Sequence, residues 1–345
     1  MKDNINNGTK ERILWVDYCK AVAIFLVIVG HVFTRTNTFS LLNVIIYSFH
    51  MPVFFFLSGY TFDNNVKFFV FLKKKARTLL LPAIMFSILF FVLYCGMISI
   101  TSGRNGLMQY LNTFLPVSDG VVNTLLMTSK SRFSNFWFLP VLFCAELLLY
   151  YILRCKYVVA QLVLILAGVA INVLLSDGDV ALPLGFGEAM LALPFLFFGY
   201  YSRKNRVFET TSPTRKVQVA LLAFIYIIAM AIWIMKGYGV AGMYDSHIEN
   251  IVLFYVAAFT GCVVFVVAVK YIGCCIGKSS KISYVGKKSL YIFGVHYIFL
   301  EWFAYFSNGF SLSTMPMKLL WDGVGICSVF VCSLIGTAAI CRGKL

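Results

Sequence analysis

Three ionisable residues lie inside one long apolar stretch near the start of the chain. Residues 13–33 read ILWVDYCKAVAIFLVIVGHVF and include Asp17, Lys20 and His31. Because about twenty apolar residues suffice to cross a bilayer, the stretch predicts a membrane-spanning helix. Ionisable side chains are costly in such a helix, and they commonly face a bundle interior or a water-filled cavity. The stretch therefore predicts a polar site inside a membrane domain.

The spacing of these residues places them on one side of the predicted helix. Lys20 and His31 are 11 residues apart, which puts them on one face and about 16 Å apart along the axis. Asp17 precedes Lys20 by three residues and can pair with it. Two interpretations are open. Asp17 and Lys20 form a structural ion pair while His31 bonds a neighbouring helix, or the cation and the imidazole act on a substrate.

The composition indicates a membrane protein. The 345 residues are 60% hydrophobic and 12% charged, with a mean hydropathy of +0.85, whereas ordinary globular domains are about a quarter charged. We predict an all-α membrane protein with one helical domain at 13–341 and short cytoplasmic tails at 1–12 and 342–345. The ten cysteines show no disulfide or metal-ligand spacing, so we interpret them as small hydrophobic residues.

The distribution of positive charge predicts the orientation. With the N-terminus placed in the cytoplasm, 22 of the 29 Lys and Arg residues fall on the cytoplasmic side and six on the other. By the positive-inside rule both termini are cytoplasmic, and the net charge of +15 indicates contact with anionic membrane lipids rather than nucleic acid. We predict a bundle of about ten membrane-spanning helices near 13–33, 41–62, 79–100, 136–153, 157–175, 183–201, 217–236, 249–270, 283–303 and 319–341.

Two connections are longer than the rest. Residues 101–135, on the predicted outer side, contain apolar patches at 107–115 and 121–127 that suit half-helices lying on the membrane. Residues 65–77, on the cytoplasmic side, mix phenylalanines with lysines. That mixture predicts a helix lying in the membrane interface.

Five further residues are predicted to surround the polar site or to contact an acceptor. The second predicted helix contains Pro52, which removes a backbone donor and loosens the turn that holds the preceding histidine. The fourth contains a mid-membrane glutamate, for which we expect Lys20 or a histidine as partner. For each histidine and for the glutamate, a structural hydrogen bond and a catalytic role are both open. The five residues are His50, Ser58, Trp137, Glu146 and His296.

Other site chemistries find no support in the sequence. The histidines lack helical i, i+3 or i+4 spacing and no cysteine cluster accompanies them, so we predict no metal site. A nucleophile-elbow pattern and a phosphate-binding glycine loop are also absent from the sequence.

Five motifs in order resemble the integral-membrane acyltransferase-3 family, which includes fucose 4-O-acetylase-like enzymes. They span nearly the whole chain. The motifs are WVDYCKAVAIFLVIVGHV at 15–32, FHMPVFFFLSGY at 49–60, KKKARTLLLPA at 73–83, FWFLPVLF at 136–143 and GKKSLYIFGVHYIF at 286–299.

The resemblance implies roles for particular residues. In this family a basic residue is followed, after ten intervening residues, by a histidine. These two positions fall on Lys20 and His31. The match implies that they form a catalytic pair, with Asp17 beside it. A donor-binding R-x-x-R-like element falls on Lys74 and Arg77. Lys20 and Lys74 stand where arginine is often found, and lysine gives no bidentate grip on phosphate or carboxylate. Lys20 therefore orients the donor or pairs with Asp17.

The resemblance also implies a reaction. Acetyl-CoA on the cytoplasmic side would donate its acyl group to a hydroxyl of a glycan or lipid-linked sugar, in a multi-pass protein of the bacterial inner membrane. The product would be an O-acetylated cell-surface polysaccharide or glycan precursor. His31 would act as a general base or would itself carry the acyl group.

Two other classes of protein are alternatives. A transporter or flippase for a glycan precursor or small anion would use Asp17, Lys20 and Glu146 as a relay, although no internal repeat is evident in the sequence. A polysaccharide polymerase would need large outer loops, and only residues 101–135 qualify.

Overall fold

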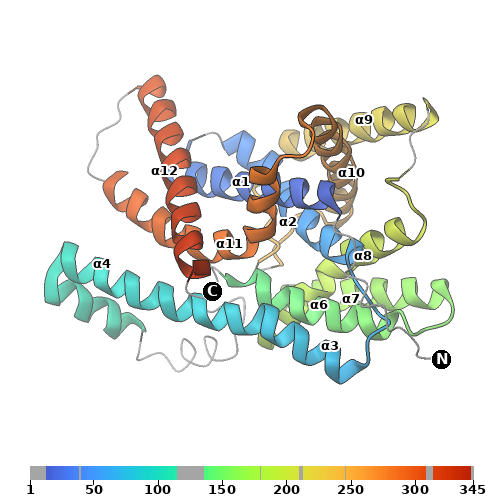
Figure 1. The fold of residues 1–345 in the computed structure, drawn as a ribbon, viewed down its shortest axis with the longest axis horizontal. Coiled ribbons are helices and arrows are strands. Elements are labelled where there is room, and N and C mark those ends of the chain that lie inside the picture. Colours follow the sequence, from blue (N-terminus) through green and yellow to red (C-terminus); the bar gives the residue numbers. More distant parts are fainter. Residues whose placement is uncertain are drawn as a thin grey trace, which may run out of the picture.

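The computed structural model describes residues 13–38, 40–114, 136–178, 180–209, 213–244, 246–307 and 314–342. Within these ranges the chain is helical, and the only extended pairing is one isolated bridge between Gly242 and His247. Each predicted span overlaps one helix (Figure 1). These helices are α1 (Leu14–Thr36), α2 (Ser40–Tyr60), α4 (Leu81–Phe114), α6 (Phe138–Ile152), α7 (Val158–Asp177), α8 (Phe186–Lys204), α9 (Pro213–Met235), α10 (Ile251–Ile276), α11 (Ser280–Ser307) and α12 (Met315–Arg342).

Eight helices in the described part of the chain are long and apolar enough to cross a membrane. They are α1, α2, α4 with the segment before it, α7, α8, α9, α10 and α12. Helix α6 has only 15 residues, and α11 carries three lysines and Glu301 along its length. The chain is therefore a multi-pass membrane protein, whereas the count of ten spans and the cytoplasmic position of both termini stay predictions.

The basic segment before α4 is part of a continuous helical rod. Helix α3 (Phe68–Lys75) passes through a π-helical turn, η1 (Ala76–Leu80), into α4 (Figure 1). Pro82 has no backbone N–H to donate to the carbonyl of Thr78, and the N–H of Leu81 bonds the carbonyl of Ala76 instead, five residues back. The helix expected within 65–77 is therefore present as α3, which continues into α4 without a break. Its place in the membrane interface stays a prediction.

Helix α4 reverses at Gly103. This glycine has φ 63° and ψ −166°, a conformation that glycine adopts at little cost. The residues after it fold back along α4, as Figure 1 shows, and the ring of Tyr110 lies 5.2 Å from that of Tyr94. The half-helix expected from the apolar patch at 107–115 is thus present up to Phe114, while the patch at 121–127 lies outside the described residues.

Glycines bring two pairs of helices into close contact. A Cβ on Gly286 of α11 would lie 1.9 Å from the carbonyl oxygen of Asp17 on α1, and one on Gly59 of α2 would lie 2.0 Å from that of Leu196 on α8. Small residues allow membrane helices to approach in this way. The α1–α11 contact matters most, since it joins the helices that carry His31 and His296.

Candidate functional site

The imidazole of His31 points into the bundle, between α2 and α11. The hydroxyl of Tyr47 on α2 lies 3.2 Å from Nδ1, and the hydroxyl of Tyr297 on α11 lies 3.1 Å from Nε2 and 3.5 Å from Nδ1. The side chain is half-buried. Both ring nitrogens of His31 therefore lie within hydrogen-bond reach of a phenol, in an orientation that suits proton transfer.

Two further histidines surround His31, and their neighbours fix their tautomers. Nδ1 of His50 lies 2.9 Å from the carbonyl oxygen of Ile46, and Nδ1 of His296 lies 2.6 Å from that of Phe293. Because a carbonyl oxygen only accepts, each Nδ1 carries the hydrogen. Nε2 of His296 is buried and has no hydrogen-bond partner among the described residues. With the two rings 5.5 Å apart, it is a spare acceptor beside His31.

An ion pair joins the same two helices one turn further along. Arg35, one turn after His31, pairs with Glu301, one turn after Tyr297. The side chains of Arg35 and Glu301 are 41% and 14% exposed, so the pair is open to the surroundings. Glu301 lies near the end of the span predicted at 283–303 and is not among the predicted site residues.

At the other end of α1 lies a cavity of about 230 Å³. Its walls combine charged and hydroxyl-bearing side chains with apolar ones. The polar lining residues are Lys20, Ser58, Thr61, Lys75, Glu146 and Ser289, and the apolar ones are Met51, Phe54, Leu79, Phe138, Leu139, Leu142, Leu290 and Phe293. Lys20 and Glu146 thus share a cavity, whereas His31 is not part of its lining.

The partner of Glu146 is Lys75, which the sequence prediction did not consider. Oε1 of Glu146 accepts from Nζ of Lys75 at 2.6 Å and from Oγ of Ser58 at 2.8 Å. Glu146 is 1% exposed, and its Oε2 has no hydrogen-bond partner among the residues that the structure describes. Lys20, one of the partners expected for Glu146, lines the same cavity, while Lys75 of α3 makes the ion pair.

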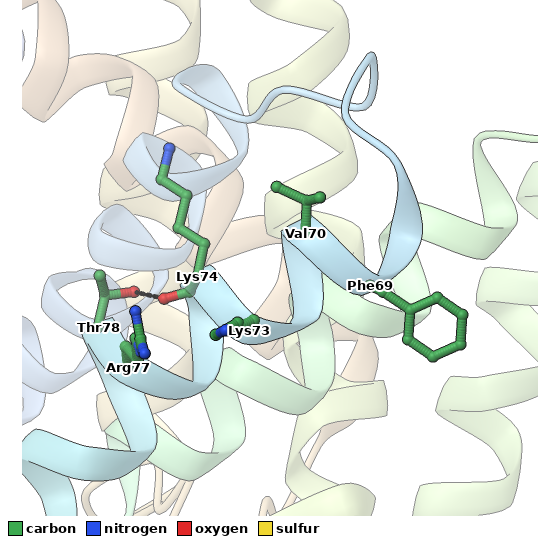
Figure 2. A pocket seen from close by; sticks show the side chains of 6 residues that line it. All are labelled: Phe69, Val70, Lys73, Lys74, Arg77 and Thr78. Atoms are coloured by element: carbon green, nitrogen blue, oxygen red, sulfur yellow. Dashed lines mark hydrogen bonds between the residues drawn. The ribbon is translucent and has the colours of Figure 1, made fainter.

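Lys74 and Arg77, on the same rod, do not line this cavity. They line an open groove of about 520 Å³ with Lys73, Phe69, Val70 and Thr78. These side chains are exposed, and Figure 2 shows them projecting from the rod, with Thr78 bonded to the backbone of Lys74. The two residues predicted to bind the donor therefore line a groove that shares no lining residue with the cavity.

Two predicted residues are not among those that line the cavity. Asp17 is buried, and its Oδ2 accepts from the hydroxyl of Ser283 on α11 at 3.1 Å. Trp137 immediately precedes α6, where its ring lies 6.3 Å from that of Phe138. Asp17 thus helps to fix the α1–α11 contact, and Trp137 belongs to an aromatic group of α6.

The structure brings six of the ten predicted residues together in two clusters. His31, His50 and His296 form one with two tyrosines, while Lys20, Ser58 and Glu146 form the other with Lys75. Sequence reasoning missed Lys75 and both tyrosines, although Tyr297 directly follows His296 in a quoted motif. Among the described residues, no group of three or more His, Cys, Asp or Glu side chains is arranged to hold a metal ion.

Comparison with known proteins identifies the family to which the chain belongs. Residues 13–340 match the family model described as an acyltransferase domain. The match covers nearly the whole chain and includes both clusters. No curated protein and no solved structure matches the chain significantly.

Proposed function

The chain belongs to this acyltransferase family, as its five motifs predicted, and on that premise we propose that it is a membrane O-acetyltransferase. The donor would be acetyl-CoA from the cytoplasm. The acceptor would be a hydroxyl of a sugar in a cell-surface polysaccharide or its lipid-linked precursor, and the location would be a bacterial inner membrane. The match to an acyltransferase family disfavours the transporter and polymerase alternatives.

The observation that carries the proposal is the placement of His31. Its imidazole faces the bundle interior and contacts two phenol hydroxyls, and a cavity with two lysines lies toward the other end of the same helix. Each ring nitrogen of His31 is within reach of a hydroxyl, and the ring lies beside the unpartnered acceptor of His296. The arrangement suits a group that exchanges protons with a hydroxyl-bearing substrate.

Two routes of acyl transfer use this imidazole. As a general base, His31 takes the proton of the sugar hydroxyl while the oxygen attacks the thioester carbonyl, the C–S bond breaks and CoA leaves as a thiolate. As a nucleophile, a ring nitrogen of His31 attacks the thioester carbonyl, the C–S bond breaks and CoA leaves as a thiolate. The sugar hydroxyl then attacks the acyl group, the C–N bond breaks and the hydroxyl proton passes to the released imidazole. Both routes need one unprotonated nitrogen, and a phenol at the other nitrogen holds the ring in place.

The donor would occupy the end of the bundle that carries positive charge. Lys20 and Lys75 face the cavity, where the free Oε2 of Glu146 could accept from an amide N–H in the arm of acyl-CoA. Lys74 and Arg77 in the outer groove suit the phosphates of the nucleotide end. The thin arm would then run from the groove around the rod into the cavity.

Glycan mass in the native host tests the proposal. Deletion of the gene should remove acetyl groups, each seen as a fixed loss of mass, and leave the polymer otherwise complete. Wild-type protein should restore the acetyl groups and His31→Ala should not. His247→Ala is the matched control, because His247 lies in an exposed loop.

Two outcomes of the glycan experiment would contradict the proposed function. Loss of the entire polymer on deletion would favour a transporter or polymerase. Full acetylation by a His31→Ala protein present at normal abundance would remove His31 from the mechanism.

A further inference from the structure

One stripe of α11 connects the cavity to His31. Ser289, Phe293 and Tyr297 follow one another at four-residue spacing, so they share one face of the helix, with a rise of about 6 Å at each step. Ser289 and Phe293 line the cavity, and Tyr297 contacts His31. Phe293 therefore stands between the place proposed for the donor and the proposed catalytic group.

The ring of Phe293 is the centre of an apolar layer. It lies 5.7 Å from the ring of Phe138, 6.4 Å from that of Phe136 and 5.6 Å from that of His296. On α1 the buried Ile24 and Val27 occupy the turns between Lys20 and His31. The layer separates the lysines of the cavity from the imidazole.

Such a layer passes some chemical groups and stops others. Charged phosphates and water are disfavoured among closely packed rings, whereas a short uncharged acyl group needs only a small displacement of one side chain. An apolar wall also discriminates by size, and each methylene is worth roughly 10–200-fold in selectivity. The side chain at the narrowest point would decide which acyl groups reach His31.

We propose that Phe293 closes the passage between the cavity and His31 and sets the length of the acyl group that the enzyme transfers. The inference rests on the proposed acyl transfer and adds to it a residue that determines specificity. Phe138, which lines the cavity and packs on Phe293, forms the facing wall.

Donor competition in membrane vesicles tests this inference. Inverted vesicles from the native host contain the natural acceptor, and they receive labelled acetyl-CoA, propionyl-CoA or butyryl-CoA. We expect Phe293→Ala to raise the ratio of butyryl to acetyl transfer about tenfold or more, because removal of the ring admits the extra methylenes. Phe293→Trp should lower the ratio of propionyl to acetyl transfer.

A matched control separates this effect from a general loosening of the core. Phe254 is as deeply buried, on α10, and is absent from the cavity lining. Phe254→Ala should therefore leave the ratios unchanged. If Phe293→Ala does not accumulate in the membrane, Phe293→Leu retains an apolar side chain and should still shift the ratio toward butyryl.

The outcomes distinguish this inference from the proposed function. Acetyl transfer by the wild type together with unchanged ratios in an abundant Phe293 variant would overturn the role of Phe293 and leave acyl transfer intact. A shift as large in Phe254→Ala would also overturn it. Absence of acyl transfer by the wild type from every donor would instead overturn the proposed function.

Discussion

The two ends of the α1–α11 pair use different kinds of polarity. Around His31 the neighbours are imidazoles and phenols, groups that can be neutral, with the Arg35–Glu301 pair one turn beyond. Around Lys20 the cavity is lined by formal charges, including the Lys75–Glu146 pair. One helix therefore presents an end suited to moving a proton and an end suited to holding an anion.

This division has a physical basis. A general base must be unprotonated, and packing among apolar and neutral groups disfavours the charged imidazolium. A donor that carries phosphates needs fixed positive charge, which is best placed where solvent ions and phosphates can approach. The surroundings of His31 would therefore bind phosphates poorly, and the charged cavity around Lys20 would be a poor place for a neutral general base. The following predictions test that contrast.

The largest expected effect concerns the ion pair of the cavity. Lys75→Ala leaves the carboxylate of Glu146 buried without its cation, and breaking a buried pair in this way costs about 3–5 kcal/mol. We expect a loss of that size in the free energy of unfolding in detergent, measured by denaturant titration. Glu146→Ala should cost less, because the Lys75 side chain is already 23% exposed.

A double variant separates stability from donor use. Lys75→Met combined with Glu146→Leu replaces the pair with apolar side chains and should recover most of the lost stability, while use of the donor should stay impaired. If the double variant recovers both stability and activity, the charges of the cavity have no part in donor binding.

A smaller effect is expected from the outer groove. Lys74→Glu with Arg77→Glu replaces two exposed cations by anions, and each lost contact to a phosphate is worth about 1 kcal/mol or less at such a surface. The KM for acetyl-CoA should rise about tenfold, with little change in acceptor preference. The pair Lys278→Glu with Lys281→Glu, exposed elsewhere on the predicted cytoplasmic side, should leave the KM unchanged; an equal rise there would show only a general charge effect.

The smallest effect concerns the tyrosines beside His31. Loss of one hydrogen bond costs about 0.5–1.5 kcal/mol, so Tyr297→Phe should lower kcat by roughly two- to tenfold with KM for the donor unchanged. Tyr47→Phe should lower kcat less, because Tyr297 lies within 3.5 Å of both ring nitrogens and Tyr47 contacts one. The reverse order would place the working nitrogen of His31 at Nδ1.

The sequence was sufficient for features that depend on local pattern. Apolar runs located the helices, because membrane helices satisfy their backbone within the segment. The spacing of Lys20 and His31 put both on the inner side of α1. The resemblance built on five motifs was confirmed by the match over residues 13–340.

Features that depend on contacts between distant segments could not be predicted. Three consecutive lysines at 73–75 look equivalent, and only the π-turn before Pro82 and the position of α6 select Lys75 as the partner of Glu146. Tyr47 and Tyr297 lie 250 residues apart in the chain, and only the packing of α2 and α11 around α1 brings their hydroxyls to one imidazole.

Transfer across sealed vesicles tests the central claim most directly. Labelled acetyl-CoA is supplied only to the cytoplasmic face, and label is counted in glycan on the opposite side, for the wild type and His31→Ala at equal abundance. We expect transfer by the wild type and a loss of about 10²–10⁴-fold in the variant. Equal transfer by both proteins, or transfer only when acetyl-CoA is supplied to the opposite face, would contradict the account.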